Sequence, residues 1–256
     1  MKLRCSYSSR QSHFAFGFAV FWLLSLNIGA LAQDRITTKD GKTQEVKILG
    51  VNGSTVQIQV GAGSIGLPLT SITSVAMAAP AELAAANTAF QAGDYAKALP
   101  LAKAVAEKYK GLPTDWARQS TSLVGDSQVS LGNLKEAEAA YKDYQRIYPG
   151  AGTLQTDIGM ARIALARKNY DEAKQKLEAI AATALNQKTP NPALAPAYSQ
   201  LFLLLGQIAE AQQQPEVALE NYLRTVTLFH EDRNAVAAAQ EKANALRKKD
   251  PTLTVP

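Results

Sequence analysis

The stretch LVGDSQVSLGNLKEA, residues 123–137, decides the fold of this 256-residue chain. An apolar run of helical character ends at Gly132-Asn133, and a second helix opens toward Ala137. Glycine suits such a break because it adopts the left-handed conformation that ends many helices. Similar breaks lie at residues 92–98 (AGDYAKA), 131–137 (LGNLKEA), 167–173 (RKNYDEA) and 213–218 (QQPEVA). Their last alanines are 39, 36 and 45 residues apart, and a recurrence of this length predicts stacked helical hairpins.

The spacing of small and large residues in these hairpins resembles that of tetratricopeptide repeats. The clearest matches are in the second and fourth repeats, at Gly125, Ala137, Tyr141, Pro149, Phe202, Gly206, Ala218 and Tyr222. The resemblance covers roughly residues 81–230. It implies a mainly α fold, an α-solenoid of about four hairpins. An Ala-rich segment, 234–249, would form the capping helix that the end of a solenoid requires.

Residues 34–75 precede the helices and read as a small all-β module. Apolar and polar residues alternate around Val46, Ile58 and Leu67, and Asp40-Gly41 and Asn52-Gly53 are strong hairpin signals. The pattern resembles small SH3-like or Sm-like barrels. Whether this module docks a ligand or only caps the helices stays open at this level.

The first 32 residues are typical of a cleaved secretory signal peptide. A basic start is followed by an apolar run from Phe14 to Leu26, and the segment closes on Ala30-Leu31-Ala32. The sequence thus predicts a signal peptide at 1–32, a β module at 33–76, a helical region at 77–250 and a disordered tail at 251–256. We expect an exported chain, periplasmic or secreted, without a membrane span after cleavage.

Charge and composition exclude several function classes. The net charge of +5 owes three basic residues and no acidic one to the leader, so it gives no case for nucleic-acid binding. Cys5 is the only cysteine, and His230 is the only histidine beyond the leader, so a His/Cys metal set is not expected. The glycines at 61, 63 and 66 lie between strands and indicate a turn rather than a nucleotide loop. We expect no cofactor, no metal and no catalytic activity.

A binding surface is expected on the first helices of the hairpins, which line the concave face in the tetratricopeptide family. The positions that this resemblance turns inward are polar and rich in amides: Asn87, Gln91, Gln119, Ser122, Asp126, Gln155, Arg162, Gln200, Gln207 and Glu210. Amides both donate and accept hydrogen bonds, which suits the backbone of an extended peptide. These residues could equally be an ordinary solvated helix surface.

The favoured function is a non-catalytic interaction scaffold that binds envelope proteins or their peptide segments. The last repeat and the helix after it also look like the ends of periplasmic tetratricopeptide proteins, among them the coordinator of the Tol–Pal system and outer-membrane assembly lipoproteins. A self-assembling structural subunit, a homo-oligomer, is the alternative. A polysaccharide or peptidoglycan binder and an enzyme are less favoured. The loop at 186–196, with three prolines, is either a functional site or a tolerated insertion.

Overall fold

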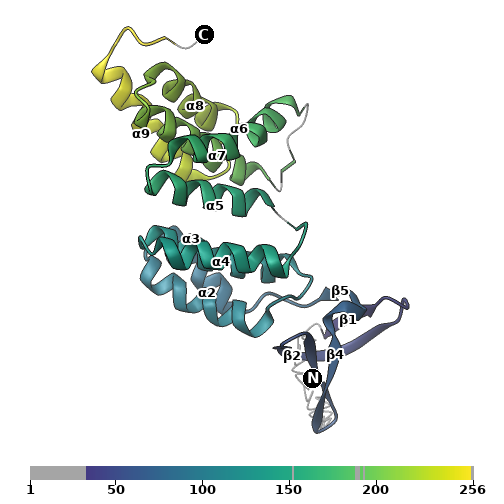
Figure 1. Ribbon diagram of the computed structural model, residues 1–256. Coiled ribbons are helices and arrows are strands. Elements are labelled where there is room, and N and C mark those ends of the chain that lie inside the picture. Colours follow the sequence, from purple (N-terminus) through teal and green to yellow (C-terminus); the bar gives the residue numbers. More distant parts are fainter. Residues whose placement is uncertain (1–32, 152, 188–190, 193, 255–256) are drawn as a thin grey trace, which may run out of the picture. The chain divides into compact units, whose positions relative to one another are not determined.

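A computed structural model of the chain shows a small antiparallel sheet followed by helices (Figure 1). The structure describes residues 33–151, 153–187, 191–192 and 194–254. The predicted leader lies outside this part, as do portions of the proline loop and of the tail. The sheet elements are β1 Asp34–Thr38, β2 Thr43–Asn52, β3 Thr55–Val60, β4 Gly63–Pro68, the 3₁₀ turn η1 Leu69–Ser71 and β5 Ile72–Ala76. The helices are α1 Ala81–Gln91, α2 Tyr95–Tyr109, α3 Asp115–Ser130, α4 Leu134–Ile147, α5 Thr153–Ala166, α6 Tyr170–Asn186, α7 Ala195–Ala211, α8 Pro215–Thr227 and α9 Arg233–Lys249.

The five strands pair antiparallel in the order β4-β3-β2-β1-β5. The predicted turns at Gly41, Gly53 and Gly61 are confirmed, because all three have positive φ between consecutive strands. The prediction was wrong for Gly63 and Gly66, which belong to β4 and pair with β3. The first part of β2, up to Val46, pairs with β1, and the part from Lys47 on pairs with β3. The register with β3 shifts between Ile48 and Gly50. Such a bulge bends a strand and lets one strand serve two parts of a sheet.

The sheet does not have a core of its own. Its inward side chains belong to one buried cluster with residues of α1, α2 and α3: Ile36, Ile48, Val56, Ile58 and Ile72 from the strands, and Leu83, Val105, Tyr109 and Leu123 from the helices. The indole of Trp116 in α3 also donates to the carbonyl of Met77, just after β5. A sheet this small buries little area alone, so the helices supply the other half of its core.

The four breaks found in the sequence are four turns of one geometry. The second residue after each first helix takes a left-handed φ, at Gly93, Gly132, Lys168 and Gln213. In each turn the next amide donates to a carbonyl five residues back, as Asn133 does to Gln128 and Gln214 to Ala209. This pattern closes the open carbonyls of a helix end. Because backbone atoms alone make it, it persists where glycine is absent.

The helices pack as pairs that stack on one another. Each first helix contacts its partner in the pair, and α3 also contacts α5, α5 contacts α7 and α7 contacts α9. The alanines that open the second helices, Ala98, Ala137, Ala173 and Ala218, are fully buried. The arrangement is consistent with a helical repeat-like fold. Among the described helices, none is both long enough and apolar enough to cross a membrane.

Two tyrosines fill the crossings between helices. A Cβ built on Gly125 would lie 2.5 Å from Tyr141, and one built on Gly206 would lie 2.4 Å from Tyr222. Both glycines are among the positions that carry the resemblance to tetratricopeptide repeats. The structure adds Gly159 of α5, where a Cβ would lie 2.2 Å from the same Tyr141 ring. Tyr141 is therefore enclosed by the glycines of two successive hairpins.

The larger buried clusters lie on either side of the junction between α4 and α5. One combines the sheet with α1–α3, and another lies between α5 and α7. The cluster that joins α4 to α5 is small and contains Ala137, Tyr141 and Ile163. Apolar packing is thus thinnest at this junction, and polar contacts contribute more there.

Replacing Gln213 by glycine should stabilise the fold. A left-handed φ costs an L-residue about 1 kcal/mol, whereas glycine adopts it freely. We expect Gln213→Gly and Lys168→Gly each to raise the free energy of unfolding by about 1 kcal/mol in urea titrations followed by circular dichroism. The reverse change, Gly93→Ala, should lower it by a similar amount. No gain in either glycine variant would mean that the turns relax away from this geometry.

Adding one methyl group at Gly125 or Gly159 should strongly destabilise the chain. The methyl would overlap the Tyr141 ring, and overpacking of a core costs about 1–3 kcal/mol. We expect a loss of about 2 kcal/mol or more for each alanine variant in the same assay. Combining Gly125→Ala with Tyr141→Leu, which shortens the opposing side chain, should cost less than the two single losses added together. Additive losses would contradict the contact.

Candidate functional site

Five of the ten predicted binding residues line one cavity of about 330 Å³: Asn87, Gln119, Ser122, Asp126 and Gln155. They come from three successive first helices, α1, α3 and α5. Phe90, Arg118, Leu123 and Tyr144 complete its lining. The stacking of the hairpins therefore brings together polar side chains that are far apart in the sequence.

The amides of this cavity meet in pairs across neighbouring helices. Gln119 Nε2 lies 3.5 Å from Asn87 Oδ1, and Gln155 Nε2 lies 3.4 Å from Asp126 Oδ2. Both distances are long for N–H···O bonds, whose usual length is near 2.9 Å. Gln119 is exposed and Asn87 is half-buried. A ligand with its own donors and acceptors could replace these weak contacts at small cost.

Ser122 and Asp126 are less available to a ligand than the amides are. The Ser122 hydroxyl donates to the backbone carbonyl of Gln119 at 3.0 Å, so only its acceptor capacity remains. Asp126 is buried, and its carboxylate accepts from the Tyr141 hydroxyl at 2.7 Å and lies 3.4 Å from Arg162 Nη1. These contacts join α3 to α4 and to α5. They place Asp126 and Arg162 in the junction between the second and third hairpins.

Burial raises the pKa of the Asp126 carboxyl above its usual range, although Arg162 and the hydrogen bonds from Tyr141 and Gln155 act in the opposite direction. Burial likewise raises the pKa of the Tyr141 hydroxyl well above its usual value. Tyr141 therefore stays protonated and continues to donate to Asp126. Arg162 Nη2 also donates to Ser130 Oγ at 3.3 Å, which fixes the guanidinium between α3 and α5.

The same combination of groups occurs again in the fourth hairpin. Glu210 of α7 accepts from the Tyr222 hydroxyl at 2.8 Å and lies 3.2 Å from Lys242 of α9. Each contact thus has three members. The tyrosine donates to an acid from the preceding helix, and a cation from a later hairpin or from the capping helix lies near that acid. Glu210 is in this respect the counterpart of Asp126.

The remaining predicted residues lie away from the cavity. Gln200 donates to Asp232 at 2.7 Å, and that aspartate caps α9. Gln207 is half-buried on α7, and Gln91 is exposed at the end of α1. None of them lines the cavity formed by Asn87, Gln119 and Gln155. Their role in binding stays a prediction.

Sequence reasoning missed three features of this region. Arg118 was not assigned to the cavity, although it directly precedes Gln119 on α3; it is already paired with Asp115. Tyr141 and Tyr222 were noted only for their spacing in the repeats, yet their hydroxyls donate to acids. The signal was present: in both repeats an acid follows the crossing glycine, by one residue at Asp126 and by four at Glu210.

Chemically, the cavity can bind polar groups. Its uncharged side chains offer amide donors and acceptors, a hydroxyl oxygen and an aromatic edge. Over the described ranges, no group of three or more His, Cys, Asp or Glu residues is arranged to hold a metal ion. His230 is exposed just after α8, away from this cavity.

The chain has a distant structural likeness among solved structures. The solved structure titled "MamA RS-1 ArsTM double mutant" has 20% sequence identity to this chain and a TM-score of 0.37, and the match covers 68% of this chain and 99% of that one. A likeness at this TM-score carries no argument about fold or function. No protein-family model matches the chain, and no curated protein matches it.

The ionisation of Asp126 should make stability depend on pH. The folded chain holds the Asp126 proton more tightly than the unfolded chain does. The stability contributed by this group is therefore fully present below the unfolded pKa of about 3.9 and is lost as the pH rises through the folded pKa. Asp126→Asn keeps the shape but does not ionise. We expect the free energy of unfolding of the wild type, relative to this variant, to fall as the pH rises above about 4.

Urea titrations at a series of pH values measure this difference directly. Burial also raises the pKa of Asp157, but that group is present in both proteins and cancels in the comparison. A difference that stayed constant or grew with pH would show that Asp126 ionises in the folded chain without penalty.

Proposed function

We propose that this chain is a non-catalytic scaffold that binds an extended segment of a partner protein along its first helices. The observation that carries the proposal is the cavity lined by Asn87, Gln119 and Gln155, which three successive first helices build together. Their amides offer donors and acceptors with only long contacts to give up. An extended peptide presents such groups at every residue, so its backbone matches a row of amides.

The fold that we propose for this scaffold is a tetratricopeptide-like α-solenoid with α9 as its cap. Four turns of one backbone geometry, the contacts between successive first helices and the tyrosine–glycine crossings support it. For the N-terminal sheet we propose an SH3-like barrel. Its strand order, the bend in β2 and the 3₁₀ turn between β4 and β5 support this.

We further propose that the scaffold acts in the cell envelope, as an exported periplasmic or secreted protein. This rests on the sequence of residues 1–32 alone, with its basic start, apolar run and Ala-Leu-Ala exit. Envelope proteins are then the partners that the chain would meet. The polar cavity, with no nucleophile set beside a base, supports binding rather than catalysis.

Self-assembly is a second candidate, favoured by one specific observation. Val60 and Ile65, at the end of the β3–β4 hairpin, are 52% and 49% exposed. Ile65 pairs with the buried Ile58 across the sheet, so it faces the same side as the core but lacks cover at the edge strand β4. A second copy could cover it. Light scattering over a range of concentrations tests for this.

The binding proposal is tested by pull-down from an envelope extract with the chain lacking residues 1–32. The variant is Asn87→Ala with Gln119→Ala, which removes two cavity amides and leaves the Asp126–Arg162 junction intact. Gln175→Ala on the second helix α6 is the matched control. We expect the double variant to lose one specific partner, by about tenfold or more in recovered amount, and the control to retain it.

Unchanged helicity and melting temperature must accompany the loss. If the double variant recovers the same partner as the wild type, the cavity is not the binding site. If no partner is recovered and the chain forms a defined homo-oligomer, the self-assembly alternative replaces the scaffold.

A further inference from the structure

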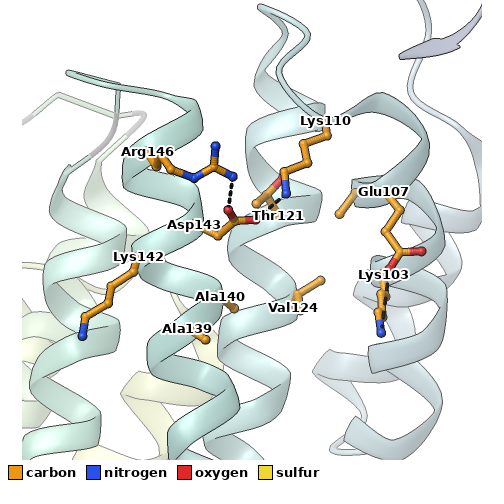
Figure 2. Close-up of a pocket in the computed structure, with 11 residues that line it drawn as sticks. Lys103, Glu107, Lys110, Thr121, Val124, Ala139, Ala140, Lys142, Asp143 and Arg146 are labelled. Carbon is orange, nitrogen blue, oxygen red and sulfur yellow. Dashed lines mark hydrogen bonds and ion pairs between the residues drawn. The ribbon is translucent and has the colours of Figure 1, made fainter. Parts of the chain in front are cut away.

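A second and larger cavity, of about 650 Å³, lies on the second helices of the first two hairpins (Figure 2). Its walls are α2 and α4, and α3 forms its floor. The floor and inner walls are made of small or apolar side chains: Ala106, Thr121, Val124, Ala139 and Ala140. We name this cavity the α2–α4 groove. It lies on a different face of α3 from the amide cavity, which takes Gln119, Ser122 and Asp126 from that helix.

The groove is open because its walls carry alanine where larger side chains would close it. Ala139 is exposed and Ala140 is half-exposed on α4, and Val124 is half-buried below them. The Thr121 hydroxyl is already used, because it donates to the backbone carbonyl of Ala117 at 2.9 Å. The floor therefore offers apolar contact rather than free hydrogen-bond donors.

Positive charge exceeds negative charge around the rim. Lys110 Nζ lies 2.5 Å from Asp143, and Arg146 shares the same carboxylate, as Figure 2 shows. Lys142 of the rim lies 2.6 Å from Glu138, which is outside the lining and also pairs with Arg167 at 2.8 Å. Two carboxylates thus serve four cations.

The remaining charged pair on the rim is weak. Lys103 lies 3.7 Å from Glu107, and both side chains are more than 60% exposed.

Burial acts to raise the pKa of Asp143, but the hydrogen bonds and charges of Lys110 and Arg146 outweigh it and lower that pKa. Asp143 is therefore ionised at neutral pH, and its single negative charge offsets only one of the two positive charges of Lys110 and Arg146. Two positive charges remain for a ligand to neutralise.

The corresponding groove between α6 and α8 differs in charge. It measures about 370 Å³, and its rim carries Lys174 and Arg224 against Glu178 and Glu220. The two pairs balance, since Lys174 lies 3.6 Å from Glu178 and Arg224 pairs with Glu220. An excess of positive charge is thus not a general consequence of pairing second helices in this fold. It is particular to the α2–α4 groove.

We propose that the α2–α4 groove binds an amphipathic helix of a partner protein, with a small apolar stripe flanked by acidic residues. The stripe would lie on Val124 and the alanines, and the flanking carboxylates would meet Lys110, Arg146 and Lys142. A third helix packs readily between two helical walls, and helix-in-groove binding uses such a stripe. The charges fix the register and the choice of partner.

A second copy of this chain is a poorer occupant than an acidic partner. Without residues 1–32 the chain has 24 basic and 22 acidic residues, a net charge of +2, and the last turn of α9 carries Arg247, Lys248 and Lys249. These groups would repel the basic rim. The proposal does not rest on the cavity lined by Asn87, Gln119 and Gln155. Either binding proposal can therefore be disproved without affecting the other.

The test uses the chain without residues 1–32 and a fluorescent synthetic peptide of about 15 residues, long enough to form a helix when bound. The peptide carries Leu and Ala at helical spacing, flanked by Glu. Two comparison peptides replace Glu by Gln, or replace the Leu/Ala stripe by Ser. Fluorescence anisotropy gives the dissociation constants.

The protein variants are Lys142→Glu with Arg146→Glu, Ala140→Trp to fill the groove, and Lys135→Glu as a control for charge on the same helix outside the groove.

We expect saturable binding of the Glu peptide, with affinity about tenfold or more lower for the Gln and Ser peptides. The double charge variant and Ala140→Trp should each lose about tenfold or more, whereas Lys135→Glu should stay within about twofold. Circular dichroism must show that the variants remain folded. Asn87→Ala with Gln119→Ala should leave this binding unchanged, which separates it from the amide cavity.

Three outcomes would overturn the proposal. The first is no saturable binding of the Glu peptide. The second is equal binding of the Ser peptide, which would show a general attraction for anions and no use of the groove. The third is binding that survives Ala140→Trp, which would place the peptide elsewhere on the chain.

Discussion

The enclosure of the Tyr141 ring by two glycines is the constraint on which the stacking of the hairpins depends. Gly125 comes from α3 and Gly159 from α5, and the ring of α4 lies against both. A ring in that position can be fully buried only where neither helix carries a Cβ. Since the apolar cluster at this junction is small, the distance between the second and third hairpins is set largely by one side chain.

The hydroxyl of the same residue links this packing to the polar face. Tyr141 donates to Asp126, which Arg162 approaches from the next hairpin. Tyr222, Glu210 and Lys242 repeat the arrangement near the end of the chain. The buried Asp126 and the half-buried Glu210 on the first helices thus help hold the repeats together. The amides between them, such as Gln119, are left with weak contacts and are the groups that a ligand can use.

Much of the architecture was predictable because tight turns and close helix contacts require small residues at particular positions in the sequence. The turn at Gly132 and the buried Ala137 follow from local sterics, and the structure has both as predicted. Lys168 and Gln213 show the limit: they take the same left-handed turn without glycine, so only the helical pattern around them indicated it. The resemblance to tetratricopeptide repeats indicated one shared face for the five cavity residues. Their pairing could not be predicted, because Gln119–Asn87 and Gln155–Asp126 depend on how neighbouring hairpins stack. The α2–α4 groove was not predicted at all, since it arises from alanines on two helices that are not adjacent in sequence.

The core shared by the sheet and the first three helices has a consequence for the order in which the chain can fold. Ile36 and Ile58 need the cover of Leu83, Val105 and Leu123, and the last of these follows β5 by more than forty residues. At a synthesis rate of about 5–20 residues per second, the strands wait several seconds for that cover. During this interval their apolar side is open to any other chain or chaperone nearby. The strands of the N-terminal module are thus made before the helices that complete their core.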